Sequence, residues 1–117
     1  MSLIFISVPT SGVTADGKLN EDFIKFVAKL HQHHPERTFI VPMLQNYALL
    51  PYLGVADVTW KVWKNHCKRL IQVCDELWVI HYDGWNSSTG VRAEIGLAVK
   101  YHKKLYHFMP DLTSRLT

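Results

Sequence analysis

The stretch YDGWNSSTGVRAEIGLA (residues 82–98) carries an acidic side chain in an unusual place. Its second half has helical spacing, and Glu94 lies three residues after Val91, on the apolar side of that helix. A carboxylate is costly to desolvate in such a place unless it is paired or borders a cavity. Two interpretations follow. Glu94 either does chemistry at a pocket, or has a structural place as a partly exposed flank residue or as a partner of Arg92 or Arg69.

The elements that must position Glu94 alternate along the chain between strands and helices. Short apolar runs bounded by turn residues predict strands over residues 3–8, 37–41, 76–82 and 104–108. Between them, polar starts and apolar stripes predict a helix capped by Asn20 that ends before Pro35, a helix capped by Asp57, and a helix over residues 89–101.

Each predicted helix has one apolar stripe that should face a sheet. The three stripes are Phe23, Ile24, Val27 and Leu30; Trp63, Cys67, Leu70, Ile71 and Cys74; and Val91, Ile95, Leu97 and Ala98. In the last helix, Gly90 and Gly96 indicate close packing of the helix on the sheet or a permissive turn. The two cysteines would lie about 10 Å apart along their helix, too far for a disulfide, so we expect both to be reduced and buried.

This alternation predicts an α/β fold with a Rossmann-like or flavodoxin-like parallel sheet of four to five strands, in the order 2-1-3-4, and helices on both faces. In such folds ligands bind at the carboxyl ends of the strands, where the strand order reverses. The loops VPTSG and YDGWNSSTG, after the first and third strands, should therefore lie side by side at a pocket. The irregular segment 42–57 is typical of a functional loop or lid.

The composition is that of one small globular domain, which we expect to span residues 1–117. The chain is 48% apolar and 20% charged, and no apolar run reaches the roughly 18 residues that cross a bilayer. The first residues lack the features of a signal peptide, so we expect a cytoplasmic protein with no membrane partner. A net charge of +3 suits a small anion, whereas polymeric nucleic acid usually requires a concentrated basic stripe.

The sequence SSTGVRAEIG contains the pattern S-x-G-V-x-x-E-x-G at Ser88, Gly90, Val91, Glu94 and Gly96. This pattern resembles the signature of the nucleoside 2-deoxyribosyltransferase superfamily, which includes 2′-deoxynucleoside 5′-phosphate N-hydrolases and a branch of small uncharacterised bacterial and phage proteins. The resemblance is sharp over residues 74–98, moderate at IFISVPTSG, and elsewhere rests on the order of strands and helices.

The resemblance implies a glycosidic mechanism. The residue matching Glu94 attacks C1′ of the deoxyribose and displaces the base, and water or a second base then resolves the covalent glycosyl-enzyme. It also implies a preference at the 5′ end of the ligand. Six residues before the nucleophile, the transferases carry an Asp that holds the 5′-hydroxyl, whereas the phosphate-preferring hydrolases have a Ser. This chain has Ser88, so we expect nucleoside 5′-monophosphates to bind better than nucleosides.

The other expected contacts lie on the two loops. Asp83 contacts a sugar hydroxyl or the base, or is an ordinary Asp-Gly turn residue. Trp85 stacks on a base, or makes a surface or dimer contact. Hydroxyl and backbone N–H groups on the loops suit a sugar or phosphate, or only form turns. These candidates are Ser7, Pro9, Thr10, Ser11, Gly12, Asn86, Ser87, Ser88 and Gly90.

Some features of the family pattern are missing. Catalytic relatives usually have a Tyr hydroxyl in the first strand that contacts the nucleophile, whereas Ile4 and Phe5 occupy that neighbourhood here. The hydrolases have an Arg near the position of Thr10, and this chain has none there. Many relatives also have an acid in the helix that precedes Cys74 and Asp75, where the candidates in this chain are Asn65, His66 and Cys67. A non-catalytic nucleotide-binding module is therefore the alternative function.

No cofactor or metal is expected. The sequence HQHH (residues 31–34) ends a helix and is more typical of solvated or dipole-capping side chains than of a metal site. None of the motifs H-E-x-x-H, C-x-x-C or G-x-x-x-x-G-K-[ST] occurs. The expected partners are a nucleoside or nucleotide and further copies of the chain, in a homodimer or higher homo-oligomer.

Overall fold

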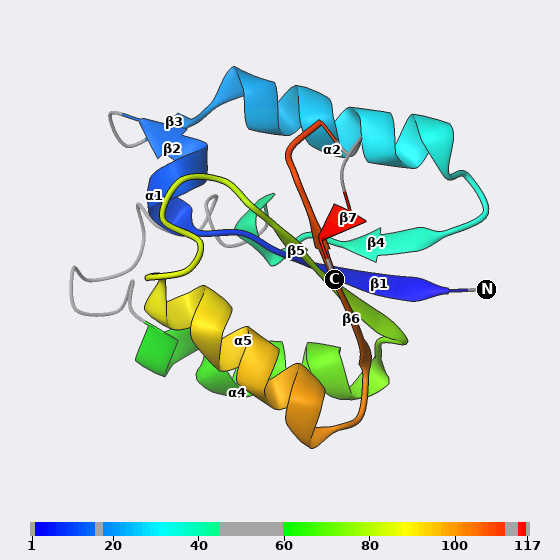
Figure 1. The fold of residues 1–117 in the computed structure, drawn as a ribbon, viewed down its shortest axis with the longest axis vertical. Coiled ribbons are helices and arrows are strands. Elements are labelled where there is room, and N and C mark those ends of the chain that lie inside the picture. Colours follow the sequence, from blue (N-terminus) through cyan, green and yellow to red (C-terminus); the bar gives the residue numbers. More distant parts are fainter. Residues whose placement is uncertain (1, 16–17, 45–59, 112–114, 117) are drawn as a thin grey trace.

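The structure is a computed structural model that describes residues 2–15, 18–44, 60–111 and 115–116 of the 117-residue chain (Figure 1). Its elements follow one another as β1 (Leu3–Ser7), α1 (Thr10–Val13), β2 (Thr14–Ala15), β3 (Lys18–Leu19), α2 (Glu21–His33), β4 (Thr38–Ile40), α4 (Trp60–Val73), β5 (Glu76–Ile80), α5 (Thr89–Lys100), β6 (Lys104–Phe108) and β7 (Arg115–Leu116). Most of the segment expected to be a loop or lid, and the expected cap Asp57, lie outside the described residues.

The main sheet has five strands in the order β4-β1-β5-β6-β7, and its first four strands are parallel. Helix α2 covers one face, and α4 and α5 cover the other (Figure 1). The predicted α/β fold with a parallel sheet between helices is thus confirmed. Counted along the whole chain, the strand order differs from the expected 2-1-3-4, because the short hairpin β2–β3 follows β1 and forms a separate sheet. The four strands predicted from the sequence are neighbours as β4, β1, β5 and β6, and β7 adds to β6 in the antiparallel direction.

Strand β1 shows why a central strand of the sheet is apolar on both sides. Ile4 and Ile6 point into the core cluster beneath α2, whereas Phe5 points into the cluster beneath α4 and α5. All three side chains are at most 1% exposed. Because helices bury both faces of the sheet, β1 reads as an almost continuous apolar run.

Helix α2 buries Phe23, Phe26, Val27 and Leu30, which have the spacing i, i+3, i+4 and i+7 of one helix face. The prediction for Ile24 was wrong, since it is 47% exposed. Phe26, which completes the stripe at i+3, takes the inner place instead. Asn20 holds the predicted N-cap position, but its side chain makes no capping hydrogen bond.

Helix α5 buries Val91, Glu94 and Ala98, while Ile95 and Leu97 pack at the margin of the core. Gly96 is exposed, and an added Cβ there would meet no atom within 4 Å, so its expected role in close packing was wrong.

Both cysteines are free and buried, as predicted. Among the described residues, no helix has the length and apolar character needed to cross a membrane.

Candidate functional site

The loops after β1 and β5 touch at the carboxyl edge of the sheet, as predicted. A Cβ added to Gly12 would lie 2.5 Å from the backbone oxygen of Asp83 and 2.9 Å from the Cβ of Tyr82. The second loop turns sharply, because the backbone N–H of Trp85 donates to the oxygen of Tyr82 and Gly84 has a φ of +87°. This left-handed conformation favours glycine, and the close approach of the loops leaves no room for a side chain at residue 12.

Glu94 lies beneath these loops and is only 9% exposed. The hydroxyl of Ser7, at the end of β1, donates a 2.6 Å hydrogen bond to its Oε1. The Cys67 thiol, on α4, also hydrogen-bonds to this carboxyl group. Three elements distant in sequence therefore converge on one buried carboxyl group.

Burial raises the pKa of Glu94 from 4.5 to about 7, although the hydrogen bonds from Ser7 and Cys67 act in the opposite direction. Burial, and secondly the charge of Glu94, raise the pKa of the Cys67 thiol. Cys67 is thus a neutral donor to Glu94 rather than a reactive thiolate. The carboxyl group changes protonation near neutral pH, which is common among acids that act in catalysis.

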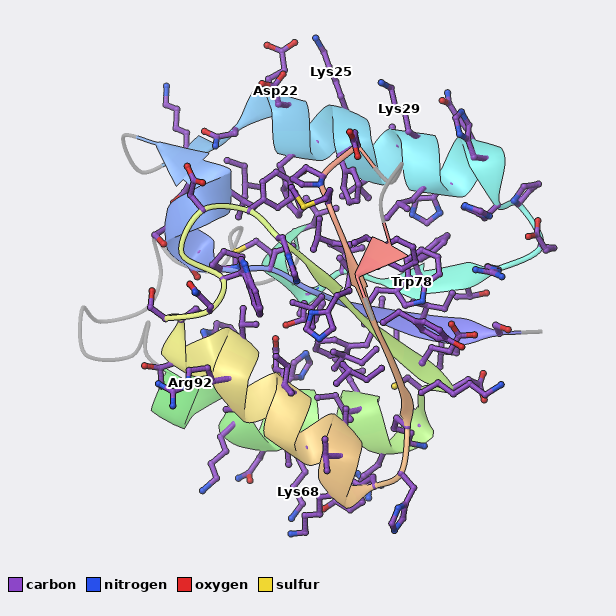
Figure 2. The ribbon with its side chains drawn as sticks, in the orientation of Figure 1. Asp22, Lys25, Lys29, Lys68, Trp78 and Arg92 are labelled. Atoms are coloured by element: carbon purple, nitrogen blue, oxygen red, sulfur yellow. The ribbon has the colours of Figure 1, made fainter. Side chains whose placement is uncertain are left out.

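The two arginines considered as partners of Glu94 lie elsewhere. Arg92 is exposed and points away from the sheet (Figure 2), and Nη1 of Arg69 donates to the side chain of Gln72 at 3.3 Å. Within the described part of the chain, no salt bridge reaches Glu94. Its burial is therefore not offset by an ion pair with either arginine.

Ser7, at the end of β1, supplies to Glu94 the hydroxyl contact that neither Ile4 nor Phe5 can make. Its hydroxyl is fully buried and donates to the Glu94 carboxyl group. It is therefore not exposed to a sugar or phosphate, which was the contact expected from the sequence. Ile4 and Phe5 do not occupy this place, because Ile4 faces α2 and Phe5, on the same face as Ser7, lies two residues farther from the carboxyl edge.

Ser88 is the N-cap of α5, and its Oγ accepts a 3.3 Å hydrogen bond from the backbone N–H of Val91. Its hydroxyl proton can still be donated to a ligand. Gly90 is open, since the nearest atom to an added Cβ is Ser88 Oγ at 3.9 Å. The Ser87 hydroxyl donates to the oxygen of Gly84 at 3.3 Å, and Asn86 is exposed.

The remaining candidates form the rim of the site. Asp83 is exposed beside Gly84 in the turn, which agrees with the turn interpretation and leaves its carboxylate accessible. Thr10 and Ser11 are exposed in the short helix α1. Pro9 is buried and precedes that helix, so it shapes the loop rather than offering a surface.

A cluster of Trp85, His81 and His107 was not foreseen. The rings of His81 and Trp85 are stacked at 3.8 Å with an angle of 7°, and His81 Nε2 lies 2.8 Å from His107 Nδ1. Burial, and the partner histidine in the case of His81, lower the pKa of both imidazoles. One face of Trp85 is thus already covered. The register of β5 and β6 brings the two histidines together, because His107 is paired with Val79, two residues before His81.

No group of three or more metal-binding side chains occurs in the part of the chain that the structure describes. The chemistry that this site offers is that of one buried carboxyl group with two neutral donors, open hydroxyls and the N-terminus of α5.

Comparison with known proteins gives one family. A family model described as Domain of unknown function (DUF1937) matches residues 3–109, which include every strand of the parallel sheet and the whole site. No curated protein and no solved structure matches the chain.

Proposed function

The chain belongs to the DUF1937 family, and from the geometry of the Glu94 site we propose that it cleaves or transfers N-glycosidic bonds of nucleosides or nucleoside 5′-monophosphates, with Glu94 as the nucleophile. The proposal includes membership of the nucleoside 2-deoxyribosyltransferase superfamily and a single Rossmann-like domain. One observation carries it: the buried Glu94 carboxyl group is held by Ser7 at 2.6 Å at the edge where the β1 and β5 loops meet.

In the first step, a Glu94 carboxylate oxygen bonds to C1′ as the C1′–N bond breaks, and the base leaves with the electron pair and takes up a proton. In the second step, water or another base attacks C1′, and the ester bond to Glu94 breaks. Ser7 and Cys67 donate to the carboxyl group and hold its orientation. Asp83, at the rim, contacts a sugar hydroxyl or the base in this proposal, and Trp85 contacts the base.

The ionised form of Glu94 is the nucleophile. Because its pKa is about 7, roughly half of the sites carry a carboxylate at neutral pH, and the oxocarbenium-like transition state would favour that form. At the other end of the substrate, Ser88 and the first N–H groups of α5 suit a 5′-phosphate. We propose a cytoplasmic homo-oligomer without cofactor as the working form.

A second function is favoured by a different observation. Oε1 of Glu94 already accepts from Ser7, the thiol of Cys67 is a second partner, and the residue is 9% exposed. A carboxyl group engaged in this way is less available for attack. A nucleotide-binding module that senses or sequesters its ligand is therefore the alternative proposal.

The test is to incubate the purified protein with a panel of deoxynucleosides and their monophosphates and to measure free base by HPLC. We expect base release by the wild type and by Glu36→Gln, a matched removal of an exposed carboxylate, and none by Glu94→Gln. Thermal stabilisation by a nucleotide without base release would instead support the binding module. Equal turnover by Glu94→Gln would exclude Glu94 as the nucleophile.

A further inference from the structure

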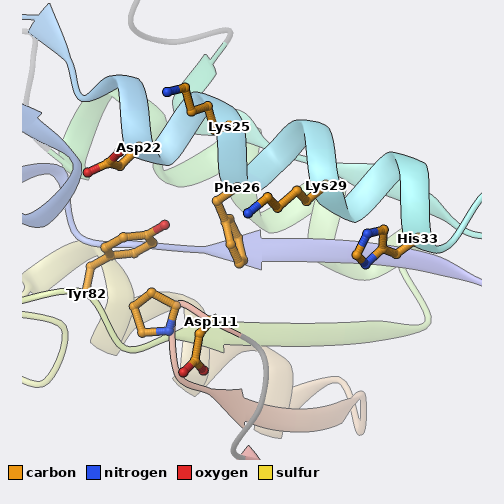
Figure 3. A pocket seen from close by; sticks show the side chains of 8 residues that line it. Asp22, Lys25, Phe26, Lys29, His33, Tyr82 and Asp111 are labelled. Carbon is orange, nitrogen blue, oxygen red and sulfur yellow. The ribbon is translucent and has the colours of Figure 1, made fainter.

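A groove with a volume of about 530 Å³ lies on the α2 face of the sheet, away from Glu94 (Figure 3). One wall is the side of α2 that carries Lys25, Lys29 and His33. The floor is formed by Phe26, Tyr82 and Pro110, where Pro110 follows β6. The volume lies within the range of pockets that take small organic molecules.

The α2 wall is basic along most of its length. Lys25, Lys29 and His33 are four residues apart, so they line one side of the helix, and Figure 3 shows Lys29 and His33 along the groove. Lys25 also contacts Glu21 at 3.3 Å in an exposed ion pair. Two acidic residues border the groove: Asp22 near Tyr82, and Asp111 on the opposite side. An anion is therefore favoured toward Lys29 and disfavoured beside Asp22 and Asp111.

The floor is apolar and aromatic. The rings of Phe26 and Tyr82 meet edge to face, with centroids 6.0 Å apart. Burial, and secondly the nearby Asp22, raise the pKa of Tyr82 to about 12, so its hydroxyl is a neutral donor at physiological pH. Apolar surface beside a polar handle suits a planar ligand body that carries a hydrogen-bond acceptor.

We propose that this groove is a second binding site, for a small phosphate monoester with a planar apolar body. The phosphate lies at Lys29, toward His33, and the body lies on Phe26 and Pro110 toward Tyr82. Lysine binds phosphate as a point charge, and the imidazole of His33 can donate a hydrogen bond beside it. The proposal does not depend on catalysis at Glu94.

The test is a titration of the full-length protein with phenyl phosphate, monitored by ¹⁵N–¹H NMR. We expect shifts in the amides of α2 and of the Tyr82–Trp85 turn, and much weaker effects from benzyl alcohol, which lacks the charge, and from inorganic phosphate, which lacks the ring. The double variant Lys25→Gln/Lys29→Gln should bind about fivefold more weakly, since each exposed charge contributes little.

Lys68→Gln is the matched control, because Lys68 lies on α4, on the other side of the sheet (Figure 2). It should leave the affinity unchanged, and Glu94→Gln should do the same. Shifts scattered over the surface, or equal weakening by the Lys68 control, would show nonspecific anion binding and overturn the proposal. Shifts confined to α5 would place the probe at the Glu94 site and also overturn it. Unfolding midpoints of the variants, measured in parallel, verify that each is folded.

Discussion

The substitution Glu94→Gln should change how the stability of the protein depends on pH. In the folded protein the pKa of Glu94 is raised from 4.5 to about 7 by burial. Between these two values the folded state binds more protons than the unfolded state. The contribution of the protonated Glu94 to stability is therefore fully present below pH 4.5 and is lost as the pH rises through about 7.

The magnitude follows from the two pKa values. Between pH 5 and pH 8 the wild type should lose roughly 2–3 kcal/mol of unfolding free energy through Glu94 alone. The residue is 9% exposed, so solvent screening reduces this figure only slightly. Gln cannot ionise and keeps a similar shape, so the variant should lack this loss.

The assay is urea unfolding of both proteins at pH 5 and pH 8, followed by circular dichroism. The lowered pKa values of His81 and His107 give a contribution of opposite sign, which is gained as the pH rises toward neutrality. It is common to both proteins and cancels in the comparison. We expect the variant to be the more stable protein at pH 8. The same pH dependence in both would refute the buried, uncompensated carboxyl group, and a variant that fails to fold would indicate a structural role.

Four further predictions concern the loops, α5 and the substrate. Gly12→Ala should destabilise the protein by roughly 1–3 kcal/mol, because its Cβ would lie 2.5 Å from the oxygen of Asp83. Gly96→Ala, in open space on α5, should stabilise the protein by up to about 1 kcal/mol. Urea unfolding measures the stability of both variants, and equal effects would contradict the close contact of Gly12 with the Asp83 loop. Ser88→Asp should keep the cap of α5 but reverse the preference for a monophosphate over its nucleoside; calorimetry would contradict this if the wild type binds the monophosphate no better. Base release should rise as the pH increases through about 7, because the ionised Glu94 attacks; a rate that falls over this range would indicate a general acid instead.

The sequence was sufficient for the four parallel strands and for the contact between the two loops. Apolar runs such as LIFIS are buried on both faces of the sheet, and only a parallel arrangement between helices provides this. Periodicity also placed Glu94 on the inner side of its helix, where the structure has it.

Features that depend on tertiary contacts could not be read in the same way. The hydrogen bond from Ser7 to Glu94 joins residues 87 positions apart, and the pairing of His81 with His107 depends on the register of two strands. Ile24 was misplaced because two apolar residues competed for one stripe, and the spacing from Phe23 favours Phe26. The edge strand β7 has only two residues, too few to leave a pattern.

The most direct test of the central claim is to look for the glycosyl-enzyme itself. The protein is mixed with a deoxynucleoside monophosphate, quenched in acid, digested and examined by mass spectrometry. We expect a deoxyribosyl phosphate adduct on the peptide that contains Glu94 in the wild type, and none in Glu94→Gln. Base release without an adduct on this peptide, or with an adduct on another residue, would contradict the assignment of Glu94 as the nucleophile.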